Sequence, residues 1–80
     1  MADSFAYEWK GKMYVVRHGE PFDRGMSDSY YRRGGEVHWW PEGTGHGEKI
    51  TSDDMTAEQI AEYNAGYEYN EAAGDFKDWG

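Results

Sequence analysis

The stretch that decides the fold is Thr56-Ala57-Glu58-Gln59-Ile60-Ala61-Glu62-Tyr63. Thr56 and Gln59 have the spacing of a capping box, in which each side chain binds a backbone N–H that the first helical turn leaves without a partner. Gly74 suits the left-handed conformation that commonly ends a helix. The pattern therefore predicts a helix over residues 56–73. Its apolar stripe, which we expect to pack on a sheet, consists of Ile60, Tyr63 and Tyr67.

The N-terminal residues alternate in the manner of β-strands. Aromatic residues at every second position from Phe5 to Trp9 share one face of an extended chain. Lys10-Gly11 suits a tight turn, and the extended pattern resumes over residues 13–16. These residues are therefore predicted to form a β-hairpin.

The middle of the chain is rich in glycine and contains both prolines. Gly and Pro recur through residues 18–35, which predicts a long loop. The runs 36–40 and 48–51 are predicted to pair as a second hairpin around a glycine-rich connection.

These segments predict one α+β domain over residues 1–80. A small antiparallel sheet of two β-hairpins packs against one C-terminal helix. Residues 1–51 are expected to form the β-rich part, and residues 52–80 the acidic helix and tail.

Length and composition exclude several classes of protein. The chain has 80 residues and no cysteine, so disulfide scaffolds and thiolate zinc sites are excluded. The three histidines lack the helical spacing that would preset a metal site, and no cofactor is predicted. No apolar run is long enough to span a membrane, and no signal-peptide core is visible, so we expect a cytoplasmic protein. So few aliphatic side chains are also compatible with a homodimer that shares an aromatic core.

The net charge of −8 is unevenly distributed along the chain. Residues 1–50 carry eight acids and seven bases, whereas residues 51–80 carry eight acids and only Lys77. The predicted helix contains no base that could pair with its acids at i, i+4 spacing. Such a face either maintains solubility or imitates the phosphates of a nucleic acid and occupies a basic groove of a partner. The residues predicted to bind this partner are Glu58, Glu62, Glu68, Tyr69, Glu71, Asp75, Asp78 and Trp79.

A second candidate surface combines aromatic and arginine side chains. Such residues are typical of protein-binding hot spots and also stack on single-stranded bases. The overall negative charge disfavours direct binding of nucleic acid. A further interpretation places the aromatic rings in the core and pairs the arginines with the acidic helix. The residues of this alternative surface are Tyr30, Tyr31, Arg32, Arg33, Trp39 and Trp40.

The run that ends in Arg17-His18-Gly19-Glu20 resembles the signature of the histidine phosphatase superfamily. By that resemblance His18 would accept a phosphoryl group, flanked by Arg17 and Glu20. The resemblance covers only a short part of the chain, and those enzymes have larger α/β folds with further arginines and a second histidine. We therefore expect no enzyme.

The sequence also resembles small accessory proteins of tailed bacteriophages. The residues that carry the resemblance are Asp28-Ser29-Tyr30-Tyr31, Asn64-Ala65-Gly66-Tyr67 and Lys77-Asp78-Trp79. It implies a small, acidic, non-enzymatic protein that inhibits a host enzyme or defence complex, as anti-CRISPR proteins do, inside the bacterial host cell. The predicted partner is thus a host protein with a basic nucleic-acid-binding surface. The alternative is a protein-interaction module that docks through residues 30–40 without mimicry.

Overall fold

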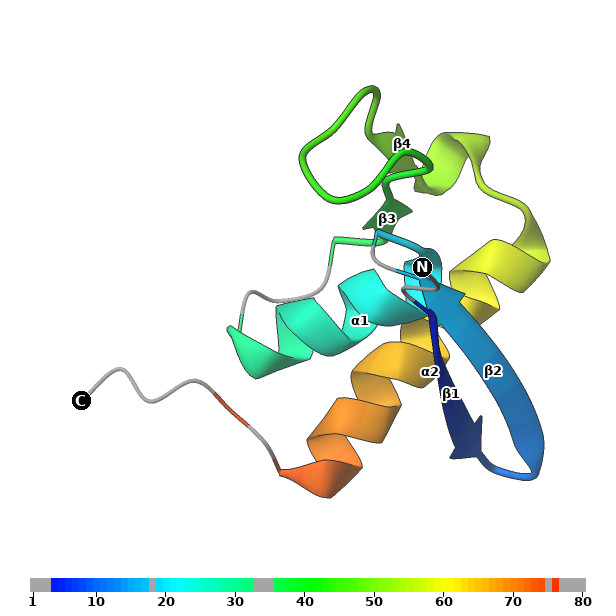
Figure 1. The fold of residues 1–80 in the computed structure, drawn as a ribbon, viewed down its shortest axis with the longest axis vertical. Coiled ribbons are helices and arrows are strands. Elements are labelled where there is room, and N and C mark those ends of the chain that lie inside the picture. Colours follow the sequence, from blue (N-terminus) through cyan, green and yellow to red (C-terminus); the bar gives the residue numbers. More distant parts are fainter. Residues whose placement is uncertain (1–3, 18, 33–35, 75, 77–80) are drawn as a thin grey trace.

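The computed structural model describes residues 4–17, 19–32, 36–74 and 76. In this part of the chain, two pairs of antiparallel strands accompany two helices (Figure 1). The elements in chain order are β1 (Ser4–Trp9), β2 (Lys12–Arg17), α1 (Pro21–Tyr30), β3 (His38–Trp39), β4 (Ile50–Thr51), the 3₁₀ turn η1 (Ser52–Asp54) and α2 (Ala57–Ala73). The α+β class predicted from the sequence is confirmed. Neither helix is both long and apolar enough to cross a bilayer, as far as the described residues go.

The predicted N-terminal hairpin is confirmed. Strands β1 and β2 pair antiparallel, with Tyr7 opposite Tyr14. Lys10 and Gly11 have φ angles of 53° and 81°, and positive values at both positions suit the two-residue turns that match strand twist. Burial alternates along β2, where Val16 is buried and Val15 is exposed. One face of the hairpin therefore packs inward and the other faces outward.

The predicted capping of α2 is also confirmed. The backbone N–H of Gln59 donates to Thr56 Oγ1 at 3.1 Å, and the backbone N–H of Thr56 donates to Gln59 Oε1 at 2.9 Å. Gly74 ends the helix with a φ of 70°, and its N–H donates to the carbonyl of Asn70. Local sequence signals thus set both ends of α2.

The long loop predicted for residues 18–35 is wrong, because residues 21–30 form α1. Pro21 occupies the first helical position, where its missing N–H needs no partner. The carboxylate of Asp23 accepts a hydrogen bond from the backbone N–H of Gly19 at 2.9 Å and fixes the entry to the helix. Pro21, a residue type that often interrupts helices and strands, therefore begins a helix here.

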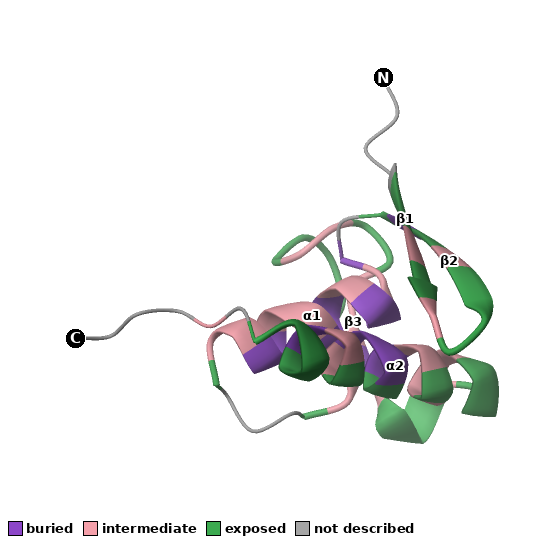
Figure 2. Ribbon diagram, turned by 90° about the horizontal axis from the view of Figure 1, so that it is seen from below, coloured by how far each residue is buried: buried purple, intermediate pink, exposed green. Residues whose placement is uncertain are grey.

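The two helices cross at a pair of glycines. A Cβ atom on Gly25 would collide with the carbonyl oxygen of Tyr63, and one on Gly66 would collide with that of Phe22. The backbones of α1 and α2 therefore touch, and their buried sides face each other (Figure 2). Gly25 serves close packing between helices and does not interrupt α1.

The core lies between this helix pair and the inner face of the hairpin. Val16, Phe22 and Ala65 are buried at its centre. The rings of Tyr7 and Tyr14 lie against Phe22, with centroid distances of 5.4 and 4.7 Å. Helix α2 contributes Tyr69, whose ring lies 5.3 Å from that of Tyr7 on the hairpin.

Two finer expectations need correction. The strand pairs form separate sheets, β1–β2 and β3–β4, and do not join into one. In the expected stripe of α2, Tyr63 packs against α1 and β3, because its ring lies 5.8 Å from that of His38 and its hydroxyl donates to Asp28. The hairpin is contacted by a neighbouring face of the helix, which carries Tyr69.

Candidate functional site

The predicted acidic surface separates into two parts along α2. Glu58 and Glu62 lie in its first half, together with Glu20 from the β2–α1 connection and two aspartates of η1. Within the described residues, none of these carboxylates takes part in an ion pair. We call this group the acidic end; it consists of Glu20, Asp53, Asp54, Glu58 and Glu62.

Three carboxylates of the acidic end influence one another. Partial burial raises the pKa of Glu62, and the negative charges of Glu58 and Glu20 raise it further. Lys12 acts in the opposite direction but does not compensate. Glu62 and Glu20 also line one small recess beside Tyr14 and Val16. The sequence indicated Glu58 and Glu62 of this cluster, and the tertiary structure adds Glu20 to them.

The acids in the second half of α2 form hydrogen bonds and an ion pair with other side chains of the same chain. Glu68 Oε1 lies 3.4 Å from Lys10 Nζ and accepts a hydrogen bond from Trp9 Nε1 at the same distance. Glu71 Oε2 accepts a hydrogen bond of 2.6 Å from Ser29 Oγ. Glu68 therefore holds α2 against the hairpin, and Glu71 holds it against α1. These internal bonds leave the two carboxylates fewer free hydrogen-bonding positions for a partner protein.

The aromatic anchors expected beside these acids are not both on the surface. Tyr69 is half-buried, and its ring lies 5.3 Å from that of Tyr7 and 5.8 Å from those of Trp9 and Phe22. It belongs to the core contacts, which corrects its predicted role as an exposed anchor. The other expected partner-binding residues, Asp75, Asp78 and Trp79, lie outside the described residues.

The alternative aromatic and arginine surface falls into two groups. At the end of α1, Tyr30 and Tyr31 pack edge to face at 4.9 Å, and the exposed Arg32 places its guanidinium 4.6 Å from the Phe76 ring. Trp40 instead lies beside Arg24. Its neighbour in the sequence, Trp39, pairs with Ile50 of β4. Arg33 lies outside the described residues.

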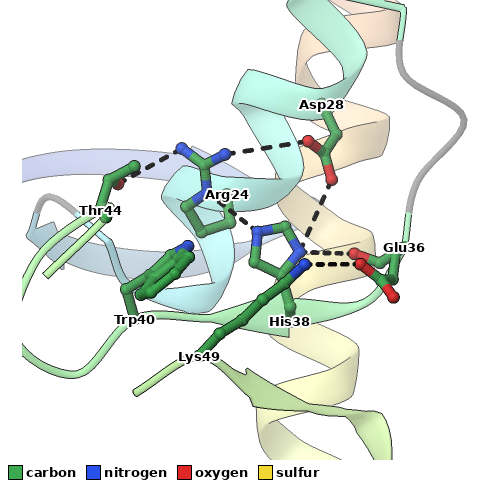
Figure 3. A pocket seen from close by; sticks show the side chains of 8 residues that line it. Arg24, Asp28, Glu36, His38, Trp40, Thr44 and Lys49 are labelled. Atoms are coloured by element: carbon green, nitrogen blue, oxygen red, sulfur yellow. Dashed lines mark hydrogen bonds and ion pairs between the residues drawn. The ribbon is translucent and has the colours of Figure 1, made fainter. Parts of the chain in front are cut away.

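A buried polar cluster joins α1, β3 and α2 and was not predicted (Figure 3). Arg24 Nε donates to His38 Nε2 at 3.1 Å, and the guanidinium lies 4.0 Å from the Asp28 carboxylate. The hydroxyl of Tyr63 also donates to Asp28. The side chains come from three separate segments, so only the helical i, i+4 pair Arg24–Asp28 left a signal in the sequence. That signal was lost when residues 18–35 were interpreted as a loop.

The hydrogen bonds of His38 define the tautomer of its ring. Its Nε2 accepts from Arg24, so the proton of a neutral ring is on Nδ1, which lies 2.6 Å from the carbonyl oxygen of Glu36. Burial raises the pKa of Tyr63, and its hydrogen bond to Asp28 raises it further, so its hydroxyl remains a donor. The cluster therefore fixes β3 on α1 with one consistent set of donors and acceptors.

A cleft of about 370 Å³ opens beside this cluster. The buried Arg24 and His38 line it together with the half-buried Trp40 and the exposed Lys49 (Figure 3). Lys49 Nζ binds Glu36 Oε1 at 2.7 Å, so positive and negative side chains balance across the opening. The described residues contain no group of three or more His, Asp or Glu side chains placed to hold a metal ion.

The stretch that resembles the histidine phosphatases is only partly described. The backbone N–H of Arg17 donates to Glu20 Oε1 at 2.8 Å, and His18 lies outside the described residues. Comparisons of this chain with protein-family models, with curated proteins and with solved structures found no match. Both resemblances noted in the sequence thus stay predictions.

Proposed function

We propose that this protein is a small acidic inhibitor that binds the basic nucleic-acid-binding surface of a partner protein through the acidic end. The observation that supports this is the grouping of Glu58, Glu62 and Glu20, where partial burial and then the charges of the two neighbours raise the pKa of Glu62. Within the described residues none of these side chains forms an ion pair. Lys12 offsets only part of the repulsion at Glu62, and Glu20 accepts one hydrogen bond from the backbone of Arg17. Glu58 and Glu62 therefore keep most of their charge for a second molecule.

The physical case rests on self-repulsion that a partner relieves. Like charges at i, i+4 on a helix, such as Glu58 and Glu62, destabilise it by a few tenths of a kcal/mol. Lysines and arginines of a basic groove would remove that repulsion on binding and would also steer the encounter over long range. Glu68 and Glu71 serve the fold, so the acidic end carries most of this binding.

The proposed partner is a host nucleic-acid-handling protein or a CRISPR-type defence complex, in keeping with the bacteriophage resemblance. The protein would act by occupying the site of a nucleic acid, without catalysis, cofactor or direct contact with DNA or RNA. A chromogenic phosphate ester tests the non-enzymatic part of the proposal. We expect no turnover, and turnover that disappears in His18→Ala would overturn it.

The binding part is tested with a double charge reversal. The tagged chain is used to capture proteins from a bacterial lysate, and each captured protein is purified and assayed for displacement of a labelled DNA duplex. We expect the wild-type chain to displace the duplex. The variant Glu58→Lys/Glu62→Lys should lose at least about ten-fold in affinity, because repulsion replaces two favourable contacts.

A matched control makes the same change of net charge elsewhere. Glu42 and Glu48 are exposed in the β3–β4 connection, so Glu42→Lys/Glu48→Lys alters the total charge equally and leaves the acidic end intact. It should displace the duplex nearly as well as the wild type. Equal losses in the two variants would show that only total charge matters, and capture without displacement would argue against mimicry.

One observation favours a second candidate function, docking through the end of α1. A shallow, largely apolar groove of about 280 Å³ runs beside Met26, Tyr30 and Tyr31, next to the exposed Arg32. Aromatic and arginine side chains around an apolar groove are typical of protein hot spots. If this surface makes the contact, Tyr30→Ser and Arg32→Ala will weaken binding, salt will have little effect, and Glu58→Lys/Glu62→Lys will bind normally.

A further inference from the structure

We propose that two copies of this chain associate through the outer face of the β1–β2 hairpin. Two of the large apolar side chains most exposed in the described part of the chain lie on this outer face: Met13 at 60% and Val15 at 70%. The helices pack only on its inner face, through Tyr7 and Tyr14. The outer face is thus an apolar surface that the rest of the described chain leaves uncovered.

The strand register places the outer side chains in three rows. Ala6 lies opposite Val15 in the middle row, and Glu8 lies opposite Met13 toward the turn. Arg17 occupies the far row, opposite Ser4. An apolar centre is therefore bounded by an acid at one end and a base at the other. Phe5 alternates onto the inner face, with Val16 opposite, and does not belong to this surface.

This charge arrangement is self-complementary. A two-fold axis parallel to the sheet and perpendicular to the strands superposes the two middle rows and brings the Arg17 row of one copy over the Glu8 row of the other. With sheets about 10 Å apart and strands about 4.8 Å apart, the two Cα atoms are about 11 Å apart, within reach of extended Arg and Glu side chains. Each dimer then gains two such contacts, and Val15 packs on the middle row of its partner.

The charge of the whole molecule also favours a second copy at this face. Two chains of net charge −8 repel each other unless they meet at a surface without excess acid. The hairpin carries Glu8 against Lys10, Lys12 and Arg17, so it is one such surface. Most of the acids of the acidic end lie on η1 and α2, not on the hairpin itself. This inference does not depend on the proposed function.

The size of the face limits the affinity. Six residues at about 3.3 Å each give strands about 20 Å long, and two strands give a face about 10 Å wide. Such a contact is smaller than the roughly 800 Å² per partner of a standard interface. We therefore expect a weak dimer, with a dissociation constant of about 10–100 µM.

Sedimentation equilibrium of the purified chain tests the inference over about 1 µM to 1 mM. The average mass should rise from 9.2 kDa toward twice that value and stop there. Glu8→Arg and Arg17→Glu should each weaken association about ten-fold, because each places like charges together twice per dimer. The double swap Glu8→Arg/Arg17→Glu should restore affinity to within about three-fold of the wild type.

Apolar variants locate the face. Val15→Lys should abolish association, and Phe5→Lys should leave it unchanged, with circular dichroism confirming that each variant is folded. A chain that stays monomeric up to 1 mM, or a mass that grows beyond the dimer, would overturn the inference. Failure of the double swap to restore affinity, or loss of association in Phe5→Lys alone, would also overturn it.

Discussion

Glu62 carries an electrostatic penalty in the folded protein. Burial disfavours its charged form first, and Glu58 and Glu20 add repulsion, so its pKa is raised in the folded protein. A carboxyl group whose pKa is raised on folding binds its proton more tightly in the native state than in the unfolded state. Its charge therefore lowers stability once the pH rises through and above the range between the unfolded and folded pKa values.

Glu62→Gln should for this reason stabilise the protein at pH 7 by a few tenths of a kcal/mol. The gain should shrink as the pH falls through the titration range of Glu62, because the wild-type side chain is then neutral as well. Urea unfolding at a series of pH values measures both effects. The same substitution should weaken binding to a basic partner. A Glu62→Gln variant that is less stable than the wild type at pH 7 would contradict the repulsion described here.

Tyr63 provides a second test at the scale of a single atom. It is only 1% exposed, and its hydroxyl donates to the buried carboxylate of Asp28. Tyr63→Phe leaves that carboxylate with one donor fewer and should lower the free energy of unfolding by about 1–3 kcal/mol. Tyr67→Phe, on the half-buried part of the same helix, is the matched control and should change it by less than about 0.5 kcal/mol. Similar losses in the two variants would exclude a specific contribution of the buried hydrogen bond.

At the scale of the elements, the crossing of α1 and α2 depends on Gly25 and Gly66. Gly66→Ala would normally favour a helix by about 1 kcal/mol. Here the new Cβ atom collides with the backbone oxygen of Phe22, which cannot rotate away as a side chain could. We expect a net loss of stability of more than about 2 kcal/mol. Thermal unfolding of this variant beside Asn64→Ala, an exposed position on α2, separates the clash from helix propensity.

The elements that the sequence predicted correctly are those defined by their own residues. The capping box at Thr56 and the turn at Lys10-Gly11 are local features, and both hold in the structure. Helix α1 was missed because Gly25 was interpreted as a loop residue, whereas it is a glycine because α2 approaches too closely for a side chain. Tertiary packing, not local propensity, decides this segment.

The residues of the candidate site also divide into those that local sequence indicated and those that only tertiary contacts reveal. Glu58 and Glu62 were found because consecutive turns of a helix place them on one face, whereas Glu20 joins them only through the β2–α1 connection. Glu68 and Glu71 looked equally available in the sequence, since nothing local indicated that Trp9 and Ser29 would bind them. Contacts between residues more than forty positions apart leave no pattern in a single sequence.

At the scale of the whole molecule, the charge of −8 links stability to ionic strength. Charges of one sign repel more in the compact state than in the unfolded chain, and the Debye length shortens from about 30 Å at 0.01 M salt to about 8 Å at 0.15 M. Adding NaCl over this range should therefore raise the melting temperature by about 5 °C, corresponding to about 1 kcal/mol for a domain of this size. Binding through the acidic end should weaken over the same range, since screening acts on attraction as well.

The acidic end carries much of the charge that produces this repulsion. Neutralising four of its carboxylates, in Asp53→Asn/Asp54→Asn/Glu58→Gln/Glu62→Gln, changes the net charge from −8 to about −4 and should remove more than half of the salt-induced rise. Melting is recorded at low protein concentration, so that association between copies does not contribute. If the variant responds to salt as the wild type does, these four carboxylates do not contribute to the repulsion that salt screens. A flattened response shows that they do contribute to it.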